Sequence, residues 1–230
     1  MRRFYKQAAA VEADGGYGIE LDGKPLKSPA KAPLVLPNRK LADAVASEWQ
    51  AQEEKVVPDS MPLMSFVSTA IDRVMPQHQA VAAEITAFAG SDHLCYRATY
   101  PADLAALQAE KWQPVLDWAQ LRFDVPFAVT TGVMPIAQSG ATLMVLGKHV
   151  VAYDSFRLTG LHTLTTVYGS LVLALAAAEG ELSMTDAFEL SQIDEEHQAA
   201  QWGRDEEALK RRERLLREIE ATERYFSLLT

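Results

Sequence analysis

Ile193-Asp194-Glu195-Glu196-His197-Gln198, followed by Gln201-Trp202-Gly203, is the most informative stretch of this 230-residue chain. It comes shortly after an uncharged run from Leu158 to Ala178, which reads as a long apolar helix. Several carboxylates beside a tryptophan, close to an apolar helix, are typical of a surface that holds a partner. We therefore expect helical structure in this part of the chain, with an acidic binding surface.

The beginning of the chain reads as short strands. Tyr17 to Leu21 alternates apolar and polar residues, and Asp22-Gly23 is a strong signal for a tight turn. Phe4 to Val11 is a further extended run, and Leu34 to Leu36 reads as a third short strand closed by a proline. These segments predict a small, mostly antiparallel sheet.

After the strands, apolar residues recur at spacings of three and four, the periodicity of helices. Asn38 is a candidate N-cap, and Ser183 with Asp186 forms a capping box. Gly203 suits a helix C-terminus, and Asp205 suits the N-cap of the last helix. The expected helices start near Asn38, Pro62, Gln77, Pro101, Ala141, Leu158, Ser183 and Asp205.

The change from strands to helices predicts an α+β fold. We expect a small N-terminal domain, residues 1–60, with an antiparallel sheet and a helix. Residues 61–230 would form a larger, mainly α-helical bundle domain. The chain is long enough to bury a core in both.

Composition narrows the class of partner. The formal net charge is -9. An acidic protein binds the phosphate backbone of nucleic acids poorly, so we expect no nucleic-acid partner. Cys95 is the only cysteine, which excludes an internal disulfide and suits a reducing compartment. The first half of the run from Leu158 to Ala178 is too polar for a lone membrane span, so we expect a buried helix and no membrane insertion.

The chain lacks the patterns of common catalytic sites. Its histidines are scattered, and the acid-x-x-His unit of Asp194 and His197 occurs once, whereas a di-iron site in a bundle needs two. There is no phosphate loop, dinucleotide fingerprint or nucleophile elbow. We expect no metal, no cofactor and no catalysis. The alternative is an enzyme of unknown class that uses Asp92, Arg97 or the acidic cluster in a cleft.

The acidic cluster itself has two interpretations. It could be a solvated helix face, and Trp202 could be a core residue. On the other hand, we place the carboxylates at the C-terminal end of a helix, where the helix dipole disfavours negative charge. A locally unfavourable arrangement indicates function, and Trp202 could then anchor a partner.

At these residues the chain resembles the chaperone family that assembles the F(1) sector of the F-type ATP synthase, in the branch that binds the α subunit. Asp194 to Gly203 matches the D-E-x-x-Q-x-x-x-W-G element of that family. Weaker elements agree in order along nearly the whole chain: Arg3 to Lys6, Leu21 to Pro29, Ala46 to Gln52, Met61 to Leu63, Thr69 to Asp72, Asp92 to Ala98, and Gly169 to Ala176.

The resemblance implies a two-domain, non-catalytic chaperone. It would hold the free α subunit, here called the client, and prevent its aggregation until the β subunit takes its place. Client contacts would come from Asp194, Glu195, Glu196, Gln198 and Trp202. The structural residues of the family motifs would be Glu48, Trp49, Gln52, Asp92, Tyr96, Arg97 and Gly169.

The resemblance also suggests where the protein works. The family pattern begins directly after Met1, which favours a bacterial protein that works in the cytoplasm. We separately expect the protein to be a monomer. A eukaryotic member would work in the mitochondrial matrix.

Overall fold

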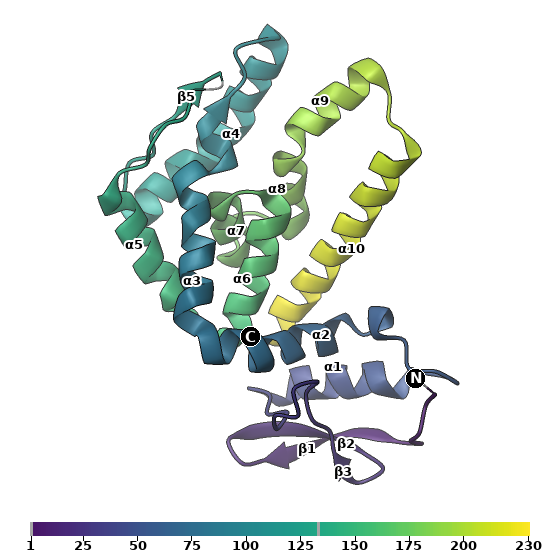
Figure 1. Ribbon diagram of the computed structural model, residues 1–230. Helices are drawn as coiled ribbons and strands as arrows, with labels where there is room; N and C mark the ends of the chain where they lie inside the picture. The colour runs from purple at the N-terminus through teal and green to yellow at the C-terminus, as the bar shows by residue number, and fades with distance from the viewer. Residues whose placement is uncertain (1, 133) are drawn as a thin grey trace. The chain divides into compact units, whose positions relative to one another are not determined.

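The computed structural model describes residues 2–132 and 134–230 (Figure 1). A small antiparallel sheet comes first and helices follow, which confirms the predicted α+β class. The strands are β1 (Ala8–Ala13), β2 (Gly16–Leu21), β3 (Lys24–Pro25), β4 (Tyr96–Arg97) and β5 (Thr130–Thr131). The α-helices are α1 (Arg39–Gln50), α2 (Pro62–Thr69), α3 (His78–Ala87), α4 (Ala102–Phe123), α5 (Gly140–Val151), α6 (Ser155–Tyr168), α7 (Leu171–Ala178), α8 (Met184–Ser191), α9 (Ile193–Trp202) and α10 (Glu206–Leu228). Short helical turns are η1 (Pro58–Ser60), η2 (Ala70–Val74), η3 (Met75–Gln77), η4 (Phe88–Ser91) and η5 (His93–Cys95).

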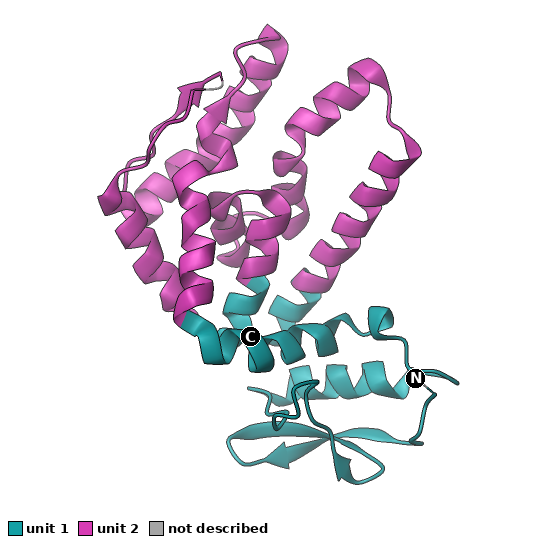
Figure 2. Ribbon diagram, viewed as in Figure 1, with its two compact units in different colours: residues 1–78, 154–160, 223–230 teal, residues 79–153, 161–222 magenta. Residues whose placement is uncertain are grey.

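The chain divides into two compact units, coloured separately in Figure 2. Unit 1 comprises residues 1–78, 154–160 and 223–230, and unit 2 comprises residues 79–153 and 161–222. This division differs from the predicted segments 1–60 and 61–230. The first unit extends through α2, and it also includes the start of α6 and the end of α10.

Unit 1 is built on the three-stranded sheet, in the order β1-β2-β3, with antiparallel pairing throughout. Helix α1 packs on this sheet (Figure 1). The Asn38 side chain accepts a hydrogen bond from the backbone N–H of Leu41, which confirms the predicted N-cap. The predicted strand at Leu34–Leu36 is wrong: between two prolines, this segment makes only an isolated bridge from Leu36 to Tyr17.

The core of unit 1 joins distant parts of the sequence. Leu36, Leu41 and Leu63 are fully buried in it. Tyr225 stacks on Phe66 with ring centroids 4.6 Å apart, and its hydroxyl donates to the Phe156 carbonyl at 3.1 Å. The end of α10 and the start of α6 are therefore part of this core.

In unit 2 the apolar helix α7 is buried on all sides, from Leu171 through Ala177. The prediction of one helix from Leu158 to Ala178 is wrong. Helix α6 ends at Tyr168, Gly169 takes a left-handed conformation with φ of 65°, and α7 starts after Ser170. No helix of the described chain combines the length and apolar character that crossing a membrane would need.

Candidate functional site

The acidic cluster lies on the first turn of α9. Asp194, Glu195 and Glu196 closely follow Gln192, where the backbone leaves helical geometry between α8 and α9. The prediction that these carboxylates sit at a helix C-terminus is therefore wrong. At an N-terminus the helix dipole stabilises negative charge, so the cluster is locally favourable and gives no sign of strain.

One side of α9 is held by α4. The Gln108 amide donates to the Asp194 carboxylate at 2.6 Å, and His197 Nε2 lies 3.2 Å from the Asp103 carboxylate. The contact with His197 is the main reason that the pKa of Asp103 is lowered, with a further contribution from the backbone N–H of Leu104. Asp194 and His197 are three positions apart, so they share one face of α9.

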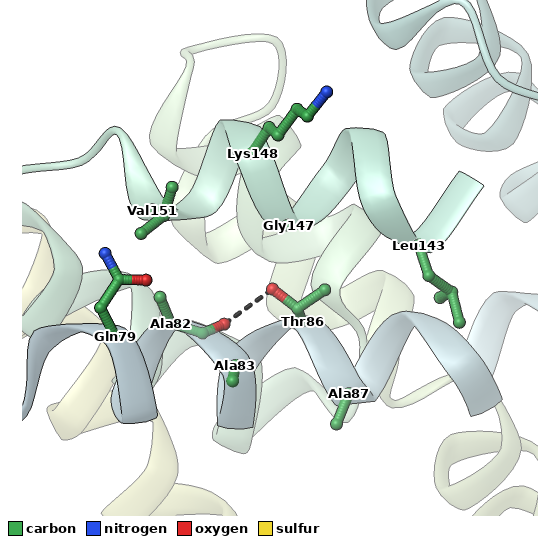
Figure 3. Close-up of a pocket in the computed structure, with 9 residues that line it drawn as sticks. All are labelled: Gln79, Ala82, Ala83, Thr86, Ala87, Leu143, Gly147, Lys148 and Val151. Carbon is green, nitrogen blue, oxygen red and sulfur yellow. Dashed lines mark hydrogen bonds between the residues drawn. The ribbon is translucent and has the colours of Figure 1, made fainter. Parts of the chain in front are cut away.

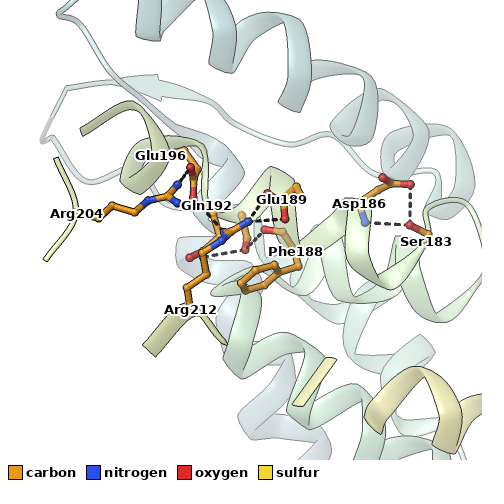
Figure 4. Close-up of polar contacts among 9 residues, drawn as sticks. Ser183, Asp186, Phe188, Glu189, Gln192, Glu196, Arg204 and Arg212 are labelled. Carbon is orange, nitrogen blue, oxygen red and sulfur yellow. Dashed lines mark hydrogen bonds and ion pairs between the residues drawn. The ribbon is translucent and has the colours of Figure 1, made fainter. Parts of the chain in front are cut away.

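A second side of α9 is held by arginines (Figure 4). Glu196 pairs with Arg204, and its other oxygen lies 3.1 Å from Arg212 Nη1. The second terminal nitrogen of Arg212 donates to both Glu189 oxygens, at 2.6 and 2.8 Å. The guanidinium also lies over the Phe188 ring, with its carbon 5.2 Å from the centroid. Arg212 thus connects α8, α9 and α10.

The third side of α9 faces solvent. Glu195, Gln198 and Trp202 lie on it, and Trp202 is 85% exposed. Their spacing of three and four residues places them in one row along the helix, about 10 Å from end to end. We call these three residues the α9 stripe. The five predicted contact residues therefore divide into this stripe and two paired carboxylates, Asp194 and Glu196.

The net negative charge of the protein is confined to unit 2. Unit 1 has twelve acidic and twelve basic residues, whereas unit 2 has nineteen acidic and ten basic ones. The α9 stripe belongs to the acidic unit. Its surroundings therefore favour a basic partner surface.

Asp92 is a fully buried carboxylate that holds the start of α7. It accepts hydrogen bonds from the Ser170 hydroxyl at 2.7 Å and from the backbone N–H groups of Val172 and Leu94. Burial raises the pKa of Asp92, and these hydrogen bonds counteract that effect. Burial, with the Asp92 charge nearby, also raises the pKa of Cys95 to about 12, which leaves an unreactive thiol.

Tyr96, Arg97 and Gly169 also have structural contacts. Tyr96 and Arg97 form β4, which pairs with β5 in parallel, and the Tyr96 hydroxyl lies 3.4 Å from the Ile136 carbonyl. Arg97 is buried, donates to the Gln108 carbonyl, and lies over the Trp112 ring. Burial lowers its pKa. The Gly169 carbonyl accepts from the His93 backbone N–H at 3.4 Å.

In unit 1, Glu48 caps α2. Its two oxygens accept from the backbone N–H groups of Leu63 and Met64, each at 2.9 Å. Burial raises the pKa of Glu48 despite these bonds. Gln52 accepts from the Val57 N–H at 2.7 Å and so fixes the loop before α2.

Trp49 is buried beneath the N-terminal segment of unit 1. It is 7% exposed, and its ring lies edge-to-face against Tyr5 with centroids 5.6 Å apart. The Tyr5 hydroxyl donates to the Trp49 carbonyl at 2.7 Å. Trp49 therefore connects α1 to the start of the chain.

A groove of about 430 Å³ runs between α3 and α5 (Figure 3). Most of its lining is small or apolar, and Lys148 is its one ionisable residue among those described. The lining residues are Gln79, Ala82, Ala83, Thr86, Ala87, Leu143, Gly147, Lys148 and Val151. It does not match the acidic cleft of the enzyme hypothesis. Within residues 2–132 and 134–230, no three side chains of the metal-binding types are grouped as a metal site requires.

Sequence reasoning missed Gln108 and Arg212, which hold α9 from two sides. Gln108 is 1% exposed, yet a single polar residue in a helical pattern gives no signal of its distant partner. Arg212 lies in a run of charged residues that reads as a solvated helix face. Its distance of 23 residues from Glu189 exceeds any local helical spacing.

Known proteins resemble this chain along its whole length. Residues 2–120 match the model of the family described as ATP12 chaperone protein. The crystal structure of Atp12 from Paracoccus denitrificans has a TM-score of 0.96 and 42% identity, and the match covers 100% of this chain and 98% of that one. A protein of Agrobacterium tumefaciens described as a putative chaperone has a TM-score of 0.94 and 44% identity, with 100% and 86% covered.

A curated relative extends the match to eukaryotes. The mitochondrial protein atp12 of Schizosaccharomyces pombe is 24% identical over 219 residues, which are 90% of this chain and 75% of that protein. The family model alone covers more than half of the chain. The chain therefore belongs to the ATP12 chaperone family, the assembly chaperones of the F1-ATPase.

Proposed function

We propose that the protein binds the free α subunit of the F1-ATPase, prevents its aggregation, and releases it when the β subunit takes its place. It would do so by binding alone, without turnover. The observation that carries the site of this proposal is the α9 stripe, which presents an exposed tryptophan and a carboxylate on the acidic unit. An unassembled subunit exposes apolar interface, which is the surface that aggregates.

Under this proposal, the client would offer a surface complementary to the α9 stripe. Trp202 suits an apolar pocket, and Glu195 suits a basic side chain about 10 Å away along the helix. Gln198, between them, can donate and accept hydrogen bonds. Asp194 and Glu196 would act through the position of α9, because both are paired within the chain. We place this activity in the cytoplasm of a bacterium, or in the mitochondrial matrix of a eukaryote.

Light scattering of refolding α subunit tests the proposal. The wild-type protein should suppress scattering at a near-stoichiometric ratio without added nucleotide. Unchanged scattering at a several-fold excess would refute the function.

A matched pair of variants tests the site. Trp202→Ala should lose at least about tenfold in potency, because aromatic anchors, tryptophan above all, often carry much of the binding energy of an interface. Leu121→Ala is the control, since Leu121 is 84% exposed on another helix of unit 2. If both variants lose potency equally, or if neither loses potency, the contact surface lies elsewhere.

A further inference from the structure

Gln108 makes three hydrogen bonds to residues outside α4. Its side-chain oxygen accepts from the Ala98 backbone N–H at 2.6 Å, and its side-chain nitrogen donates to Asp194 at 2.6 Å. Its carbonyl accepts from the Arg97 guanidinium. This one buried residue therefore joins the segment after β4 to the first turn of α9.

The two side-chain contacts require an amide in one orientation. The Ala98 N–H needs an acceptor and the Asp194 carboxylate needs a donor, and a neutral amide supplies one of each. Gln108 is buried and Asp194 is half-buried, and a buried polar group without its partner is costly. Leucine or glutamate at this position would leave at least one group unpaired.

These contacts hold one face of α9 against α4 and so restrict its rotation about its own axis, together with the arginine contacts of Glu196 on another face. Asp194 and His197 both meet α4, at Gln108 and at Asp103. Glu195 directly follows Asp194, so a helix turned by one residue, about 100°, would carry the α9 stripe away from its present direction. Asp103 is exposed, whereas Gln108 is buried, so the Gln108 contact is the better shielded of the two.

We propose that Gln108 is a positioning residue that fixes the rotation of α9 and thereby the direction of the α9 stripe. The use of this positioning in client binding rests on the proposed function. The effect of Gln108 on α9 itself does not depend on the client. Gln108 acts through Asp194 and touches no client atom.

Exchanging the amide and the carboxylate between Gln108 and Asp194 tests their hydrogen bond. Gln108→Glu places a second carboxylate against Asp194. Adding Asp194→Asn reverses the direction of the hydrogen bond, because the new amide on α9 donates to the new carboxylate on α4. That carboxylate keeps its other oxygen for the Ala98 N–H. Asp194→Asn alone should be mild, because its oxygen can still accept from Gln108.

Hydrogen exchange of residues 193–203, measured without client, reads out the position of α9. Gln108→Glu should speed exchange there by about tenfold, as expected for an unpaired buried group, while α1 and α2 are unaffected. The double variant should return to within about threefold of wild type. Client protection, measured by light scattering, should fall and recover in parallel.

The outcomes separate the two proposals. Unchanged exchange in Gln108→Glu overturns the positioning role, as does a folded double variant without recovery. A double variant that is unfolded by thermal melt shows a general core residue and also overturns it. If exchange follows the expected pattern but wild type does not protect the α subunit, the control of α9 stands and the proposed function fails.

Discussion

The Ser170 hydroxyl donates a hydrogen bond to Asp92 across 78 positions of sequence. Ser170 is also the N-cap of α7, because its oxygen accepts from the Leu173 N–H at 3.0 Å. Asp92 adds a bond to the Val172 N–H in the same turn. A buried carboxylate from one segment thus completes the cap of a buried helix from another, where water cannot satisfy the free N–H groups.

This relationship predicts the effect of Asp92→Asn. One Asp92 oxygen accepts from Ser170 and Leu94, and the other accepts from Val172. In asparagine an NH2 group replaces one of these oxygens, and in either orientation it would face a backbone N–H that needs an acceptor. We expect a loss of about 1–3 kcal/mol in unfolding free energy, measured by urea denaturation. Ser170→Ala should also destabilise, by about 1 kcal/mol, through the lost cap. Wild-type stability in Asp92→Asn would contradict this account.

Gly169 precedes that cap and gives a second prediction. Its φ of 65° disfavours any side chain, although a methyl group there would meet nothing within 4 Å. Gly169→Ala should therefore cost about 1–2 kcal/mol from backbone strain alone. Gly140→Ala is the control, since Gly140 has equal space and no positive φ, and it should be neutral or slightly stabilising. Urea denaturation of both variants decides, and equal stability would refute the strain.

Local capping patterns were predictable from the sequence, and contacts between distant segments were not. The caps at Asn38 and Ser183 depend on neighbours within three residues, and the structure contains both. The break at Gly169 was hidden within continuous apolar periodicity, and Asp92 lies far away in sequence. The start of α9 was missed for a related reason: Gln192 is neither glycine nor proline, so nothing local marks the end of α8.

The same limit applies to the site. The sequence identified the residues of α9 by their resemblance to a family motif, but not which side each one faces. Tertiary partners on α4 and α10 determine that Asp194 and Glu196 are paired while Glu195 is exposed. No helical spacing within α9 could distinguish these carboxylates.

Two tryptophans allow a matched test of burial. Trp49→Arg should cost about 3–5 kcal/mol or more, because a buried ring is lost and a guanidinium lacks a partner. Trp202→Arg changes an exposed side chain and should stay within about 0.5 kcal/mol of wild type. Thermal and urea melts measure both. A Trp49→Arg protein that melts like wild type but fails to bind the client would place Trp49 at the interface instead.

The raised pKa of Glu48 predicts how the stability of the protein changes with pH. Burial raises its pKa above the ordinary 4.5, so the folded protein binds this proton more tightly than the unfolded chain does. The stabilisation from protonation is complete below the unfolded pKa and is lost as pH rises through the folded one. Relative to Glu48→Gln, wild type should therefore gain stability as pH falls from 7 towards 4.5. Urea denaturation at several pH values checks this, and a constant difference between the two proteins would contradict it.

The acidic residues of α9 give the most direct test of the client surface. Glu195→Lys reverses an exposed charge on the α9 stripe. If the client contact is desolvated, binding of the client should weaken by about 2–5 kcal/mol, and protection should fall with it. Its fold should lose only about 0.3–1 kcal/mol, because lysine is disfavoured at a helix N-terminus. Glu12→Lys makes the same charge change on an exposed strand residue and should retain protection.

Glu196→Lys should behave differently, because Glu196 pairs with Arg204 and Arg212. A lysine there brings three cations together, so α9 and the start of α10 should loosen before any client is present. Hydrogen exchange without client should therefore rise over residues 193–212 in Glu196→Lys and remain at the wild-type level over α10 in Glu195→Lys. Equal exchange in the two variants would mean that the Arg212 contacts do not hold α9. Full client protection by Glu195→Lys at moderate salt would show that Glu195 is a solvated residue and that the client binds elsewhere.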